Sequence, residues 1–135
     1  MKTMSPEKRI YVIVPRFVKT NDNTKLEMSC GRIMAQVCHV VSKLKLRLKC
    51  NPDESFTTVV LAVEDDIELG WIEDKLIEYG KNRNQFTYES FFDDGEDFYG
   101  DKFKYLTGLA MFLTKKQGKS LFYNLTPWRC SVKSE

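Results

Sequence analysis

The chain has 135 residues, of which 42% are hydrophobic, 13% aromatic and 30% charged, and its formal net charge is +2. This composition is typical of one folded domain with a buried core and argues against a disordered chain. No apolar run approaches the roughly 20 residues of a membrane span. Charges flank the short apolar stretch near the N-terminus, which argues against a signal peptide. We therefore expect a cytoplasmic protein with no membrane association.

The small net charge hides a strong segregation of charge along the chain. Residues 1–50 have a balance of +8, residues 51–100 a balance of −11, and residues 101–135 a balance of +5. Such segregation favours a basic face suited to phosphates and an acidic face elsewhere. The alternative is that helices with charged outer faces simply differ in sign.

Apolar periodicity and turn residues predict seven elements, with Pro15 closing the first strand and Gly80 capping the second helix. In chain order they are a strand at 9–15, helix at 28–49, strand at 56–63, helix at 65–79, strand at 85–92, strand at 105–114 and short helix at 115–123. The first strand is apolar on both sides, which indicates a central position. This order predicts an α/β fold, a three-layer α/β/α sandwich with a small mixed, mostly parallel four-stranded sheet.

A polar stripe runs along the expected helix 28–49. Arg32, Gln36 and His39 are spaced at i, i+4 and i+7, and Lys43 continues the same line. The stripe follows a buried strand and a glycine-containing turn, and ligands of α/β proteins bind near such strand–helix corners. It is either an ordinary solvent-exposed helix face or the functional face of the protein.

A second candidate region is acidic, and it follows the strand at 85–92. Paired carboxylates can do acid–base chemistry or hold Ca²⁺ or Mg²⁺, but the spacing differs from an EF-hand loop. We therefore favour a solvated acidic turn and expect no metal and no cofactor. The four cysteines show no CxxC pair, and we expect free thiols. The carboxylates are Asp93, Asp94, Glu96, Asp97 and Asp101.

The sequence GRIMAQVCH resembles the signature of the second, archaeal- and eukaryotic-type class of peptidyl-tRNA hydrolases. In that signature a glycine and a lysine open the helix, and a glutamine and a histidine follow at the spacing of Gln36 and His39. The family's Asp-Ala-Gly-x-Thr motif after the third strand is similar to DDGED at 93–97, and its next strand carries a threonine where this chain has Thr107. The resemblance runs from residue 9 to about residue 128, so that residues 1–135 are expected to form one domain of this type.

The resemblance implies metal-independent hydrolysis of the ester that links a peptide, or an N-blocked aminoacyl group, to the 3′ end of tRNA. Asp93 is then the acid that orients or activates water, and Thr107 is a hydrogen-bonding hydroxyl. Gln36 and His39 help to position the tRNA end or the hydrogen bonds of the site, and Arg32 takes the place of the catalytic lysine. Lys43 and Asp97 complete the candidate site as substrate-binding residues.

Two positions depart from the family pattern. Arg32 cannot deprotonate as a lysine can, although it can neutralise a phosphate or a developing oxyanion. Asp97 adds a charge where the motif has a hydroxyl.

These departures leave three hypotheses open. The first is a peptidyl-tRNA hydrolase-like enzyme. The second is a catalytically impaired relative that binds tRNA or another RNA through the basic first third. The third is a protein-interaction module in which the acidic face of residues 64–101 binds a basic protein. A homodimer is a further hypothesis for the assembly.

Overall fold

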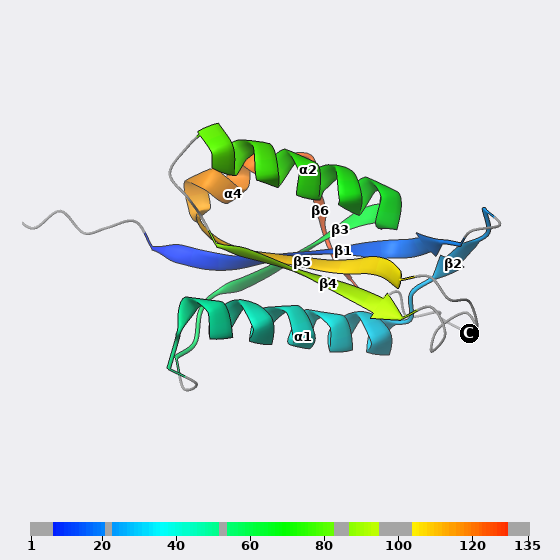
Figure 1. Cartoon of the computed structure of the whole chain (residues 1–135), viewed down its shortest axis with the longest axis horizontal. Helices are drawn as coiled ribbons and strands as arrows, with labels where there is room; N and C mark the ends of the chain where they lie inside the picture. The colour runs from blue at the N-terminus through cyan, green and yellow to red at the C-terminus, as the bar shows by residue number, and fades with distance from the viewer. Residues whose placement is uncertain (1–6, 21–22, 52–53, 83–86, 95–103, 130–135) are drawn as a thin grey trace, which may run out of the picture.

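A computed structural model describes residues 7–20, 23–51, 54–82, 87–94 and 104–129. Within them, a six-stranded sheet lies between two helical layers (Figure 1). Helix α1 (Cys30–Leu48) covers one face, and helices α2 (Asp66–Asn82) and α4 (Lys115–Leu121) cover the other. The expected α/β class and three-layer arrangement are confirmed. No helix among the described residues is long and apolar enough to cross a membrane.

The sheet differs from the expected four-stranded, mostly parallel one. Its order is β4-β5-β1-β3-β6, with β2 paired to β1, and β1–β3 is the single parallel pairing in this part of the chain. Strand β5 runs antiparallel to both of its neighbours. The sequence did not predict β2 and β6, because these strands are too short to show the alternation of apolar and polar residues that indicates a strand. The strands are β1 (Lys8–Lys19), β2 (Lys25–Glu27), β3 (Thr58–Asp65), β4 (Tyr88–Asp94), β5 (Lys104–Thr114) and β6 (Thr126–Pro127).

The core consists of two clusters, one on each side of the sheet. Alternating residues of β1 contribute to both, because Ile10 and Val12 face the α1 side whereas Tyr11 and Ile13 face the α2 side. This confirms that the first strand is central and buried on both sides.

The first strand does not end at Pro15, as expected, but continues to Lys19. Pro15 lies opposite Val63 in the parallel ladder with β3. The pairing of β1 with β5 already ends at Ile13. At Pro15, β1 therefore has a paired neighbour on the β3 side only. Proline has no backbone N–H to donate, and a strand tolerates it where one neighbour is missing.

Helix ends follow local capping with one exception. The Ser29 hydroxyl accepts a hydrogen bond from the Arg32 backbone N–H and opens α1, and Lys49 closes it in the left-handed region at φ 56°. Gly80 was expected to cap α2, but the helix continues to Asn82. Gly80 lies inside the last turn of α2. A glycine inside a helix lowers its stability only modestly, so the helix can continue past it.

The acidic segment begins inside the sheet and not in a loop. Asp93 is paired with Tyr105 at the end of β4, whereas residues 95–103, including Asp97, lie outside the described residues. Because β4 is hydrogen-bonded to β5 and packs against α1, Asp93 is held beside that helix. This placement creates the site.

Candidate active site

The polar stripe of α1 faces β4 near the start of the helix. Arg32 and Gln36 lie one helical turn apart, and Ile33 and Val40 on the adjoining face are fully buried against the sheet. Packing of this apolar face fixes the rotation of the helix. The two polar side chains are thereby directed along β4.

Asp93 accepts two hydrogen bonds from α1 on one carboxylate oxygen. Arg32 Nη1 lies 2.8 Å from Oδ2 and forms an ion pair with it, and Gln36 Nε2 donates to the same oxygen at 2.9 Å. The Asp93 side chain is 13% exposed and that of Arg32 is 32% exposed. Two donors on one oxygen hold the carboxylate in a fixed orientation.

Gln36 is a buried polar residue, with 4% of its surface exposed. Its donation to Asp93 defines the orientation of the amide, because the reverse orientation would place two acceptor oxygens together. The amide oxygen Oε1 is then buried and has no hydrogen-bond partner among the described residues. A buried unpaired oxygen is unfavourable, so this residue is not explained by stability alone.

Thr107 is the other buried polar side chain in the described part of the chain, and it is fully buried. It sits at a bulge between β4 and β5. Phe91 pairs with Gly108 and Phe92 with Leu106, so that Thr107 has no partner opposite it. Its hydroxyl donates to the Phe91 carbonyl oxygen at 3.5 Å. Bulges redirect side chains and occur often beside active sites.

His39 and Lys43 contact β4 farther along the helix. The His39 ring stacks on Phe91 with ring centroids 5.1 Å apart and an interplanar angle of 11°. Lys43 Nζ donates to the Ser90 carbonyl oxygen at 2.9 Å and lies 3.8 Å from a carboxylate oxygen of Glu89. His39 is therefore part of the site's wall, whereas Lys43 binds the backbone of the neighbouring strand.

These side chains surround an open hollow of about 480 Å³. Arg32, Gln36, His39 and Asp93 all line it, whereas Thr107 and Lys43 do not. The structure thus brings four of the seven candidate residues together and leaves Asp97 outside the described residues. The complete lining is Ser29, Arg32, Ala35, Gln36, His39, Phe91 and Asp93.

Phe91 and Glu89 are site neighbours that the sequence interpretation did not single out. Phe91 carries the His39 ring, and Glu89 forms an ion pair with Arg47 at 2.8 Å. Both belong to the strand expected at 85–92. Their spacing of two places them on one face of that strand, which is the only signal that could have indicated them.

The arrangement contains the groups needed for acid–base chemistry. An oriented carboxylate accepts a proton from water, and a guanidinium beside the same hollow stabilises negative charge. Within the described residues, no group of His, Cys, Asp and Glu is arranged to hold a metal ion. Cys30, Cys38 and Cys50 are free thiols, and Cys130 is outside the described residues.

No protein-family model and no curated protein matches the chain. Its fold is similar to the solved structure of a protein of unknown function from Agrobacterium tumefaciens strain C58. The two have a TM-score of 0.59 and 11% sequence identity, over 91% of this chain and 98% of the other. At this identity the likeness concerns the fold alone.

Proposed function

We propose that the protein hydrolyses the ester bond between a peptide, or an N-blocked aminoacyl group, and the 3′ end of tRNA. The observation that supports this proposal most directly is the convergence of Arg32 and Gln36 on one oxygen of Asp93. The resemblance to peptidyl-tRNA hydrolases assigns Arg32 and Asp93 to the reaction and Gln36 to positioning. Asp93 lies 61 residues from Arg32 and 57 residues from Gln36 in sequence, so local structure alone does not explain their meeting.

In the proposed reaction Asp93 acts as the base. It takes a proton from a water molecule whose oxygen attacks the ester carbonyl carbon. Arg32 stabilises the negative charge that develops on the carbonyl oxygen. The bond to the ribose 3′-oxygen then breaks, and this oxygen takes up a proton, which gives a free carboxylic acid and deacylated tRNA. Gln36 acts as a positioning residue that keeps Asp93 oriented.

The test is single-turnover release of a labelled acyl-peptide from tRNA. We expect Asp93→Asn to lower the rate at least about 100-fold, since it removes the proton acceptor. Arg32→Lys restores the residue type of the resembled family, and we expect it to retain release.

Glu89→Gln is a matched control. Like Asp93, Glu89 is a largely buried β4 carboxylate, 18% exposed, that pairs with an arginine of α1 at 2.8 Å. This substitution removes the same kind of ion pair from the same two elements, outside the hollow. Release that falls equally in both variants would indicate a loss of folding and not of chemistry. Wild-type protein that leaves peptidyl-tRNA intact would refute the proposal that it is a hydrolase.

A non-catalytic RNA-binding module is the second candidate. The residue at position 32 favours it, since Arg32 stands where the resembled family has its catalytic lysine and cannot deprotonate as a lysine can. Release that is absent in the wild type but gained in Arg32→Lys would establish this reading. Binding that is absent, or insensitive to salt, would exclude it.

Location and assembly stay predictions. We infer a cytoplasmic protein, as expected from the sequence. The homodimer and the basic protein partner for residues 64–101 are hypotheses that no described contact addresses. Within that segment, residues 83–86 and 95–101 lie outside the described residues.

A further inference from the structure

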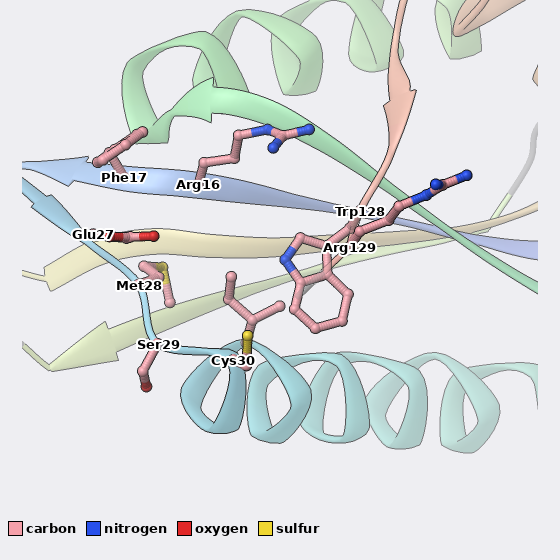
Figure 2. A pocket seen from close by; sticks show the side chains of 9 residues that line it. Arg16, Phe17, Glu27, Met28, Ser29, Cys30, Trp128 and Arg129 are labelled. Atoms are coloured by element: carbon pink, nitrogen blue, oxygen red, sulfur yellow. The ribbon is translucent and has the colours of Figure 1, made fainter. Parts of the chain in front are cut away.

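A second hollow, of about 360 Å³, opens beside the first one. Its volume falls in the range of roughly 300–1,000 Å³ that small-molecule sites occupy. Figure 2 shows the Trp128 indole above the first turns of α1, with Glu27 on the opposite side of the hollow. The lining residues are Arg16, Phe17, Glu27, Met28, Ser29, Cys30, Ile33, Trp128 and Arg129.

The two hollows flank the same turn. Ser29 lines both of them, and the first turns of α1 separate them. Cys30 and Ile33 face the second hollow, whereas Arg32 and Gln36 face the first. A ligand that passes over Ser29 can therefore occupy both.

The C-terminal segment builds this second hollow. Strand β6 pairs with β3, and the Trp128 backbone N–H donates to the Val60 carbonyl oxygen at 3.0 Å. Arg16 Nη2 donates to the Thr126 hydroxyl at 3.1 Å, which ties β1 to β6. The backbone of Trp128 is thus anchored to β3, and its indole is half-buried.

The side chains combine three kinds of recognition. The Trp128 indole offers a flat surface on which a base can stack. Arg16 and Arg129 supply two positive charges suited to a phosphate. Glu27 can accept hydrogen bonds from a ribose hydroxyl or an exocyclic amino group. Among the described residues, neither Arg129 nor Glu27 has an ion-pair partner.

We propose that this hollow binds the 3′-terminal nucleotide of an RNA, the nucleotide whose ribose carries the ester. The base stacks on Trp128, and its 5′-phosphate lies near Arg16 and Arg129. The ribose then lies over Ser29, with the ester in the hollow that contains Asp93. The inference rests on the proposed function for the role of the ribose, but binding of the nucleotide is measured without any reaction.

The chain contains two tryptophans, which provides a direct readout. Trp71 is 66% exposed on α2, in the opposite helical layer, so Trp71→Phe leaves Trp128 as the only indole without disturbing the core. The trinucleotide CCA should quench the fluorescence of this variant. The dinucleotide CC should bind at least about fivefold more weakly, because it lacks the stacked base. Trp128→Phe, which retains Trp71, should show no quenching.

For three further variants, affinity is measured by the anisotropy of a fluorescein-labelled RNA that ends in CCA. Arg129→Gln removes an exposed charge with no folding role in the described contacts, and it should weaken binding severalfold. Lys119→Gln removes an equally exposed charge on α4, away from both hollows, and should leave the affinity unchanged. Trp128→Leu should weaken binding more than Arg129→Gln does.

Equal affinity for CCA and CC, or unchanged quenching when CCA is replaced by CC, would overturn the inference. So would equal effects of Arg129→Gln and Lys119→Gln. The Asp93→Asn variant separates this result from the proposed reaction. In this variant CCA binding should persist while release is lost. Wild-type protein that binds CCA but leaves peptidyl-tRNA intact would support the nucleotide site and refute the proposed reaction, and wild-type hydrolysis without Trp128 quenching would do the reverse.

Discussion

The side-chain amide of Gln36 links α1 to Asp93, the proposed base. Its nitrogen donates to Asp93 at 2.9 Å, while its oxygen is buried and has no hydrogen-bond partner in the described part of the chain. A leucine at this position would bury an apolar group in its place and remove the unpaired oxygen. The residue therefore allows stability and positioning to be measured separately.

We expect Gln36→Leu to change the free energy of unfolding by less than about 1 kcal/mol, because the lost hydrogen bond is offset by removal of the unpaired oxygen. The single-turnover rate should fall about tenfold or more, since Asp93 loses one of two orienting contacts. Urea denaturation and the release assay measure the two effects. A loss of several kcal/mol with an unchanged rate would show that the amide serves folding only.

Asp66 is a residue at which pH acts on stability. Burial raises its pKa above the ordinary 3.8, and hydrogen bonding by the Lys19 backbone N–H, at 2.8 Å, partly opposes this effect. The folded protein therefore binds the Asp66 proton more tightly than the unfolded chain does. Ionisation of this group destabilises the fold as pH rises from about 3.8 through the raised pKa.

We expect Asp66→Asn to stabilise the protein at pH 7, because the amide oxygen still accepts the Lys19 N–H and no charge is desolvated. The gain should be under about 1 kcal/mol, since the group is only half-buried. It should vanish as pH falls toward 4. Thermal unfolding of both proteins across this pH range measures the difference. A gain that grows on acidification would contradict the assignment.

At the scale of elements, close packing rather than helix propensity decides where glycine is required. A Cβ atom at Gly118 of α4 would overlap the Tyr11 ring of β1, and this ring is itself buried in the core beside Phe122. At Gly70 of α2 a Cβ atom would meet nothing within 4 Å. Close packing therefore requires a glycine at position 118, whereas position 70 has room for a side chain.

We expect Gly118→Ala to destabilise the fold by about 1–3 kcal/mol, because the Tyr11 ring must move inside a packed core. Gly70→Ala is the matched control, and it should stabilise the fold by about 0.5–1 kcal/mol through helix propensity alone. Chemical denaturation of the two variants gives both values. Equal effects of the same sign would show that α4 does not pack on Tyr11 as described.

At the scale of the whole molecule, the two long helices carry opposite net charge, whereas α4, which lies in the same layer as α2, carries three lysines. Helix α1 contains four Lys and Arg residues and no acidic residue, whereas α2 contains five Asp and Glu residues and two lysines. The helices cover opposite faces of the sheet (Figure 1). The charge segregation along the sequence therefore distinguishes α1 from α2, and the basic α1 follows the Ser29 turn that both hollows share.

We expect Lys43→Gln to weaken the binding of acceptor-stem RNA and to reduce the slope of log affinity against log salt by about 1, the value for one phosphate contact. Lys81→Gln, an equally simple loss of charge on α2, should change neither quantity. Fluorescence anisotropy at several salt concentrations measures both. An unchanged slope for Lys43→Gln would exclude this lysine from the RNA-binding face.

The sequence by itself determined the features that depend on local periodicity. A 3.6-residue apolar period predicts α1 and places Arg32 and Gln36 on one face, and an apolar run buried on both sides predicts the central β1. Both features are present in the structure. They require no knowledge of distant contacts.

Only the tertiary structure decided what faces the stripe. The pairing of β4 with β5, and the packing of both on α1, bring Asp93 to Arg32 across 61 residues of sequence. The bulge at Thr107 and the hollow around Trp128 likewise depend on strand register. Register is set by the burial of whole strand faces against neighbours far away in the chain, and no local pattern contains that energy.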